Sequence, residues 1–558
     1  MHEKLIKAAL GEIPADIVLK NANILNVFTG EIIRGDVAVI DGYVAGIGDY
    51  ENAAVAEDLN GGFLVPGFIN THCHVESSMV TPDIYCREEL RHGTTTLITD
   101  PHEIANVGGI DGVNFMLEAT RDIPVNYFVQ APSCVPATAF ENPGDTLDAG
   151  KISRLLQNPR VLGLGEMMNY PGVLGCDREV MEKLDLASGK VIDGHAPGLA
   201  GNLLQAYASV RVSTDHESTS FEEALEKLGA GIAVLVREGS ACKDLAAIIP
   251  GVVSNKINTE RLAFCTDDKH IADIRWEGTI RHCVQKAISL GLPAADAYRM
   301  ASYNAARIYR LWDLGAIAPG YRADFVVVGN LERVDVKAVY SGGKQIIADE
   351  LPCRPALSWS NSVNFAKPSP GCFDLPEREA YPVIELQKDQ VVTKKRMVNR
   401  DEVKKLLETG ELCKIAVLER HHATGNVGVG LLGGYGLQSG AVASTVGHDS
   451  HNLIIAGTND GDMLAAAEHI KAIQGGYALI QNGRPVRDVP LPIYGLMSGE
   501  EPEHFIKMLE ELKARVHEAG VPRHIEPFIT LSFMALPVIP EIRITDMGMF
   551  DVTSFSFI

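Results

Sequence analysis

The chain has 558 residues, 46% of them hydrophobic and 22% charged, which is typical of a folded protein with several domains. Its net charge of −22, from 50 basic and 72 acidic residues, argues against nucleic-acid binding, which needs a basic surface. We find no apolar run of membrane-spanning length and no signal peptide, so we expect a cytoplasmic protein without a membrane partner, whose ten scattered cysteines stay reduced.

Two stretches, 1–65 and 315–350, consist of short apolar runs separated by Asn, Asp and Gly, a pattern that indicates strands and turns. Because they flank a block of different character, we expect them to form one small β-domain built from both sides of that block.

The block itself, 66–314, alternates eight apolar, β-branched runs with helical stretches such as GVNFMLEATR and FEEALEKLGA. Strand–helix alternation predicts a parallel sheet, and eight repeats in roughly 250 residues fit a closed (β/α)8 barrel. The active site of such a barrel lies at the C-terminal ends of its strands, where polar residues follow each run here.

A Pro-rich linker is expected at 351–376, followed by a C-terminal α/β or α+β domain at 377–558, so that the whole chain belongs to the α/β class. The last domain carries four histidines in two short motifs, His421, His422, His448 and His451. By composition they could bind a metal or form a local structural cluster, but we favour the interpretation that they border the barrel mouth.

Metal-binding side chains follow five of the eight predicted strands. The first run ends in His72-Cys73-His74, and residues two apart on a strand point to the same face, so both imidazoles can reach one cavity. A single His or Glu at a strand end is more often hydrogen-bonded or exposed, but five compatible ends indicate a metal site for Zn, Mn or Fe(II). The remaining candidates are Glu166, His195, His216 and Asp267.

Several stretches resemble a known family. PGFINTHCHVE, RHGTTTLITDP, CTDD and GAIAPGYRADFVVV are similar to landmarks of the amidohydrolase superfamily. Within it, HCHVESSM, TDPHEIANVGG, GLGEMMNYPGV, TDHEST and the C-terminal GNVGVGLLGGYGLQSGAVASTVGHDSHNL most resemble the bacterial adenine deaminases, so the likeness covers nearly the whole chain.

The resemblance implies hydrolysis of adenine to hypoxanthine and ammonia in purine salvage, with two divalent metals, Mn(II) or Fe(II) and with Zn(II) possible. It also implies a homo-oligomer, a dimer or larger. His72, His74 and Asp267 would hold the first metal, and Glu166 would bridge in the place where many relatives carry a carboxylated lysine. The second metal would bind His195 and His216.

Two carboxylates are candidates for proton transfer. Asp267 is well placed to take the proton of the attacking water, with Asp268 beside it in a supporting or loop role. Asp100 is the second candidate, although an Asp before Pro101 equally well initiates a turn. Residues in loops at the same end of the barrel could contact the purine or be ordinary loop residues: Glu76, Ser77, Ser133, Arg237 and Glu238.

Two alternatives remain open from the sequence. Another amidohydrolase, acting on a cyclic amide or a different nucleobase, would share the barrel and the metals, although Glu166 and the extra domain count against it. A catalytically inactive scaffold barrel is the other, and the filled ligand positions count against that.

Overall fold

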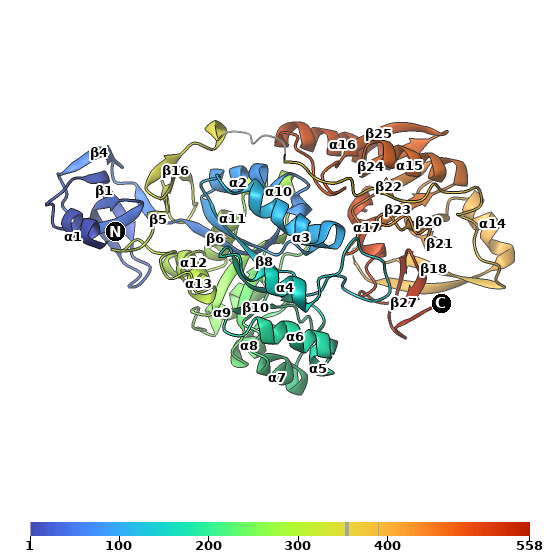
Figure 1. The fold of residues 1–558 in the computed structure, drawn as a ribbon, viewed down its shortest axis with the longest axis horizontal. Helices are drawn as coiled ribbons and strands as arrows, with labels where there is room; N and C mark the ends of the chain where they lie inside the picture. The colour runs from blue at the N-terminus through green and yellow to red at the C-terminus, as the bar shows by residue number, and fades with distance from the viewer. Residues whose placement is uncertain (1, 352–356, 389) are drawn as a thin grey trace.

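The computed structural model describes residues 2–351, 357–388 and 390–558. Figure 1 shows three parts side by side along the long axis: a β-rich part that carries the N-terminus, a central α/β part, and a C-terminal part of orange and red elements. Among the described residues, no helix combines the length and the apolar character needed to cross a membrane.

The first part is an eight-stranded sheet that draws strands from two distant stretches of the chain. Residues 15–66 supply five strands, and three more from 325–346 join the same sheet through antiparallel pairing of Val326 with Val65. These elements are α1 His2–Ala9, β1 Ala15–Leu25, β2 Ile32–Ile40, β3 Tyr43–Gly48, β4 Ala53–Asp58, β5 Phe63–Pro66, β15 Phe325–Val328, β16 Val336–Ser341 and β17 Lys344–Ile346, followed by η2 Ala348–Glu350.

Eight parallel strands form the central part. They are β6 Phe68–His74, β7 Thr94–Thr99, β8 Asn126–Ala131, β9 Val161–Met167, β10 Val191–Gly194, β11 Thr214–Asp215, β12 Ala233–Arg237 and β13 Leu262–Cys265. Ser213 N–H donates to the carbonyl of Ile192, which connects β10 to β11. After β13 the chain continues into β14 Asp267–Asp268, which pairs with β6. The strands therefore run around one axis and return to β6, as the sequence predicts.

The strands of this barrel are buried on both faces because helices cover their outer side. All residues of β6 and of β7 are buried, as expected for parallel strands inside an α/β fold. The helices are η1 Glu76–Ser78, α2 Pro82–Arg91, α3 His102–Ala119, α4 Ala149–Leu155, α5 Tyr170–Leu174, α6 Arg178–Leu186, α7 Gly201–Ser209, α8 Phe221–Gly229, α9 Leu245–Ser254, α10 Ile271–Glu277, α11 Ile280–Ser289, α12 Ala294–Met300 and α13 Tyr303–Ile308.

The C-terminal part is built on a largely antiparallel eight-stranded sheet in the order β19-β18-β21-β20-β23-β22-β24-β25. Its elements are β18 Ala380–Leu386, β19 Thr393–Asn399, α14 Arg400–Glu408, β20 Leu412–Leu418, β21 Val427–Gly433, β22 Ala441–Ser444, β23 Leu453–Gly457, α15 Asp460–Ala472, β24 Gly476–Gln481, β25 Arg484–Pro490, α16 Pro502–Glu518, α17 Pro527–Met534, β26 Ile542–Thr545, β27 Gly548–Asp551 and β28 Ser556–Phe557.

Polar contacts join this part to the barrel. Asn452 Nδ2 donates to the carbonyl of Asn142 at 2.9 Å, and Thr545 Oγ1 donates to the carbonyl of Phe140 at 2.7 Å. Residues 352–356 of the expected linker lie outside the described residues. From residue 357 the segment packs on the C-terminal sheet, where the side chains of Phe365 and Phe373 are buried. The barrel and the last sheet are thus held together over residues that are distant in sequence.

Candidate active site

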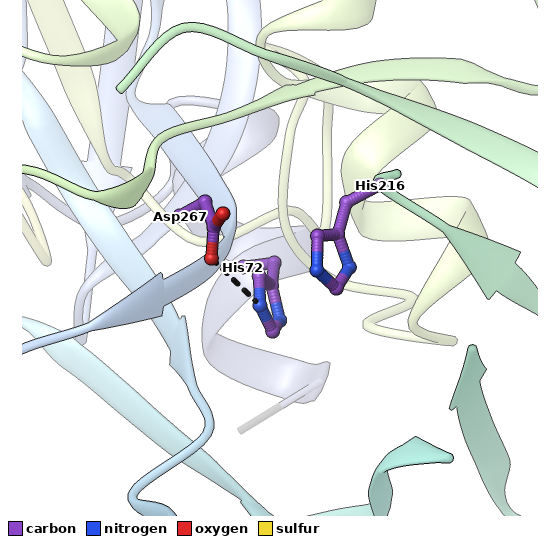
Figure 2. Close-up of side chains that lie close together, drawn as sticks. All are labelled: His72, His216 and Asp267. Carbon is purple, nitrogen blue, oxygen red and sulfur yellow. Dashed lines mark ion pairs between the residues drawn. The ribbon is translucent and has the colours of Figure 1, made fainter. Parts of the chain in front are cut away.

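The candidate ligands converge at the C-terminal ends of the barrel strands. His72 and His74 end β6, Glu166 lies near the end of β9, and Asp267 forms β14 directly after β13. His195 and His216 each follow their strand by one residue. Figure 2 shows His72, His216 and Asp267 pointing toward one another from separate elements. Since parallel strands of a barrel end on one rim, the fold brings these six side chains together.

The first group contains His72, His74 and Asp267. The Nε2 atoms of the two histidines are 3.2 Å apart, and Asp267 Oδ1 lies 3.0 Å from His74 Nε2 and 3.6 Å from His72 Nε2. All three ligand atoms therefore face the same small space. Asp267 has a left-handed backbone with φ of 56°, an uncommon conformation for a residue other than Gly that Asp tolerates better than most.

Glu166 connects this group to a second one. Its Oε1 lies 3.3 Å from His74 Nε2 and 3.8 Å from His72 Nε2, whereas its Oε2 lies 2.6 Å from His195 Nδ1 and 3.4 Å from His216 Nε2. One carboxylate thus faces two sets of imidazole nitrogens with its two oxygens. This is the arrangement that a carboxylate bridging two cations requires.

The spacing of these nitrogen and oxygen atoms is suited to ligands that share a metal ion. The rings of His72 and His216 stack with centroids 4.0 Å apart. Burial, together with the charge of His216, lowers the pKa of His72 to about 4, whereas at His216 burial is outweighed by Glu166, which raises the pKa to about 9, so His216 would release its proton on binding a metal ion. A neutral imidazole is the form that binds a metal. The sets His72–His74–Glu166 and Glu166–His195–His216 each place their ligand atoms within 4.8 Å of one another, close enough to hold one ion each.

Surrounding charges hold these ligands in place. Arg237 Nη1 lies 2.9 Å from Asp267 Oδ2, so one oxygen of this carboxylate is fixed while Oδ1 faces the histidines. On the other side of the site, Asp215 Oδ1 accepts a hydrogen bond from Ala196 N–H, next to His195, and Oδ2 accepts from Lys227 Nζ at 2.6 Å. Such partners orient ligands and contribute to metal affinity.

Asp100 lies beneath the site rather than at its open face. It is fully buried, and its Oδ2 accepts the backbone N–H of Glu166 at 2.8 Å, while Oδ1 has no hydrogen-bond partner among the described residues. A Cβ at position 165 would lie 2.2 Å from Asp100 Oδ2, so Gly165 allows this close approach. The carboxylate is within 3.8 Å of His102 Nδ1. Its expected part in proton transfer stays a prediction.

A cavity lies between the barrel and the C-terminal sheet, and its lining residue Asp268 is the neighbour of the candidate ligand Asp267. Two of the expected substrate residues, Glu76 and Ser77, line it together with Asp268. Glu76 Oε1 accepts the N–H of Ile104, its Oε2 has no partner among the described residues, and burial raises the pKa of this carboxyl to about 7. The apolar and polar lining from the C-terminal side includes Val446, His448, His451, Tyr477, Leu496 and Phe533.

The other three expected substrate residues have protein partners and do not line this cavity. Ser133 Oγ donates to the Glu166 carbonyl at 2.6 Å, Arg237 pairs with Asp267, and Glu238 Oε1 lies 2.5 Å from Lys286 Nζ. Their contact with substrate stays a prediction.

Three cavity or site residues were missed from the sequence. His102 Nδ1 lies 3.2 Å from Glu166 Oε1, and Glu103 lies beside it at the beginning of α3. His270 lines the cavity near Asp268. His102 and Glu103 follow directly after TDP at the end of the second predicted strand. Their position after a barrel strand could therefore have indicated that they lie near the site.

The four C-terminal histidines divide into two pairs. His448 and His451 line the cavity at the barrel mouth, whereas His421 Nε2 lies 2.7 Å from the carbonyl of Ser450 and His422 Nε2 lies 3.1 Å from the carbonyl of Pro143 in a barrel loop. The positions of His448, His451 and His422 agree with the expectation that these histidines border the barrel mouth.

Comparisons with known proteins identify the family to which the chain belongs. Residues 63–346 match the amidohydrolase family model, and residues 390–556 match the adenine deaminase C-terminal domain. An adenine deaminase 2 of Carboxydothermus hydrogenoformans is 44% identical, with 99% of this chain and 98% of that protein covered. Adenine deaminases of Clostridium acetobutylicum and of Nitratidesulfovibrio vulgaris strain DP4 are each 45% identical over at least 98% of both chains.

The chain belongs to the adenine deaminase family. The family resemblance and the α/β amidohydrolase fold expected from the sequence are thereby confirmed. Amidohydrolases are metal-dependent enzymes, and the described residues of this adenine deaminase family member include groups whose ligand atoms lie close enough together to hold a metal ion.

Proposed function

We propose that this enzyme hydrolyses adenine to hypoxanthine and ammonia. The observation that carries the proposal is the identity of 44–45% to adenine deaminases over essentially the full chain. The barrel and the C-terminal domain both contribute to the cavity next to Asp267, and both are included in this similarity. The reaction forms one bond from a water oxygen to C6 of the purine and breaks the bond from C6 to the exocyclic nitrogen.

Two divalent ions would be held by the six strand-end residues, with His72, His74 and Asp267 at one and His195 and His216 at the other, and with Glu166 between them. When bound, such ions lower the pKa of a coordinated water toward 7 and so supply a nucleophile at neutral pH. We propose Mn(II) or Fe(II) as the native ions, with Zn(II) as a third choice that these ligands also accept.

Proton transfer is assigned to Asp267. The Arg237 guanidinium holds its Oδ2, so Oδ1 stays directed at the site and can take the proton of the attacking water. Ammonia leaves only after the exocyclic nitrogen is protonated, and the same carboxyl can return the proton to that nitrogen. Asp100, through its hydrogen bond to the backbone of Glu166, would position the bridging carboxylate and His102.

The cavity suits a flat, uncharged heterocycle. Apolar side chains such as Leu496 and Phe533 can cover its faces, and Glu76, Ser77 and Asp268 provide polar groups for its edge. Ser77 Oγ donates to Asp268, which fixes both groups at the rim.

The test is an ultraviolet assay of the Mn(II)-loaded enzyme with adenine. We expect a metal-dependent shift from the adenine to the hypoxanthine spectrum. Failure to convert adenine, with two metals per chain confirmed by mass spectrometry, would overturn the proposal, and a panel of adenosine, cytosine and cyclic amides would then identify the substrate class. A cytoplasmic location and a homo-oligomer remain further predictions, to be checked by fractionation and by light scattering.

A further inference from the structure

One polar cluster in the cavity is not used by the metal site or by the proton transfer described above. Glu103, at the beginning of α3, meets His448 and His451, which lie in the segment between β22 and β23 of the C-terminal part. His448 Nδ1 is 2.7 Å from Glu103 Oε1, and His451 Nε2 contacts Glu103 Oε2. The cluster therefore connects the barrel to the C-terminal sheet at the substrate cavity.

The hydrogen bonds of His451 decide how the cluster works. The N–H of Gly447 donates to His451 Nδ1 at 3.2 Å, so Nδ1 carries a lone pair and the proton of the neutral ring lies on Nε2. Nε2–H then faces Glu103 Oε2, the atom that it contacts. A metal ion would need a lone pair at Nε2, and this tautomer does not offer one. We therefore interpret the cluster as a hydrogen-bond network that fixes the carboxylate of Glu103 rather than as a third metal site.

His448 is the member of the cluster that reaches the cavity. Its Nδ1 faces Glu103, and its ring stacks on Phe533 with centroids 5.5 Å apart and planes inclined by 22°. Its Nε2 has no hydrogen-bond partner within the described parts of the chain, and 15% of its side chain is exposed. Burial acts to lower the pKa of His448, but the charge of Glu103 outweighs it and raises the pKa to about 9, so both ring nitrogens carry a proton at neutral pH.

We propose that His448 is a substrate-binding residue, supplied by the C-terminal part, whose Nε2–H donates to a ring nitrogen of the purine, while Glu103 and His451 hold the imidazole in place. This inference rests on the proposed function. Adenine has acceptor nitrogens on both rings and no anionic group, so a donor from His448 would fix its orientation in the cavity. The carboxylates of Glu76 and Asp268, which also line the cavity, would serve as acceptors.

The experiment compares the Mn(II)-loaded wild type with His448→Ala, His448→Gln and Glu103→Gln. His504→Ala is the matched control, because 59% of the His504 side chain is exposed on the same C-terminal part, away from the cavity. We expect His448→Ala to raise KM for adenine by roughly 10- to 100-fold, the range for losing a hydrogen bond from a charged donor. Metal content should stay at the wild-type value, and the control should keep wild-type kinetics.

A glutamine at position 448 retains a donor near the Nε2 position and should recover part of the lost affinity. Glu103→Gln should raise KM in the same direction, and combining it with His448→Ala should add little, because both act through one hydrogen bond. Deaza-adenines, tested as competitive inhibitors, identify the contacted nitrogen. The analogue that lacks this nitrogen should bind wild type and His448→Ala equally, whereas the other analogues should bind the variant more weakly.

The outcomes separate the two proposals. If the wild type does not convert adenine, the proposed function fails and this inference fails with it. If the wild type is active and His448→Ala keeps the wild-type KM with every analogue, only this inference is overturned. If every deaza analogue loses affinity in His448→Ala by the same factor, the residue shapes the cavity without donating to the ring, which also overturns the inference.

Discussion

Replacing Lys227 by Met should destabilise the barrel while leaving its surface unchanged. The Lys227 side chain is completely buried, and its Nζ lies 2.6 Å from Asp215 Oδ2 and 2.9 Å from Glu223 Oε1. Methionine matches the length of the lysine stem but leaves the fully buried Asp215 without a counter-charge. Removing one partner of a buried ion pair costs about 3–5 kcal/mol.

Urea unfolding measures this cost. With a slope of about 3 kcal/mol per M for a domain of this size, the midpoint should fall by roughly 1–1.7 M. Metal content should fall as well, because Asp215 accepts the N–H groups of Ala196 and Glu217, the neighbours of His195 and His216. The matched control is Lys404→Met, whose side chain is 86% exposed and 3.9 Å from Glu408, and which should move the midpoint little.

A double variant, Lys227→Met with Asp215→Asn, removes the unpaired charge and should recover part of the loss. The reasoning is refuted if Lys227→Met unfolds at the wild-type urea concentration, or if the double variant is less stable than the sum of the two single changes.

Three further predictions concern the site and its pH dependence. Glu166→Gln should lower metal content below two per chain and lower the rate with it, as measured by mass spectrometry and turnover; two metals with full activity would contradict a bridging role. Asp100→Asn keeps an acceptor for the Glu166 N–H but removes the carboxylate that could transfer a proton, so kcat should fall at least ten-fold with near-normal metal content; an unchanged rate would leave Asp100 its positioning role alone. Burial and nearby Asp449 raise the pKa of Glu141 to about 8. Relative to an unfolded value of about 4.5, this carboxyl takes up a proton on folding, so it lowers stability as the pH rises from about 4.5 to 8. Glu141→Gln should therefore raise the urea midpoint at pH 8.5 more than at pH 5, and an equal change at both would contradict this assignment.

The sequence predicted the part of the site that depends on regular geometry. Successive barrel strands end on one rim, so His72, Glu166 and Asp267 could be placed together from the strand pattern alone. Their separation of up to 195 positions did not matter, because the repeat of strand and helix specifies which ends meet.

Contacts that depend on how the C-terminal part packs against the barrel could not be predicted from the sequence. Glu103 and His448 show no shared local pattern, and only the packed structure places their atoms 2.7 Å apart. The same holds for Arg237 and Glu238, which suggested substrate contacts by their loop position but have partners within the barrel. The orientation of a side chain at a strand end depends on the charged groups around it, and those groups come from several strands of the barrel.

The division of the cavity between the barrel and the C-terminal sheet also sets an order during synthesis. The last of the six strand-end ligands is Asp267, whereas the cavity wall on the other side begins at Val446. A ribosome that adds 5–20 residues per second needs on the order of 10–35 s to travel between these positions. During that interval all six candidate ligand residues have been synthesised and the wall residues have not, so the ligand group is complete in the chain before this cavity can form.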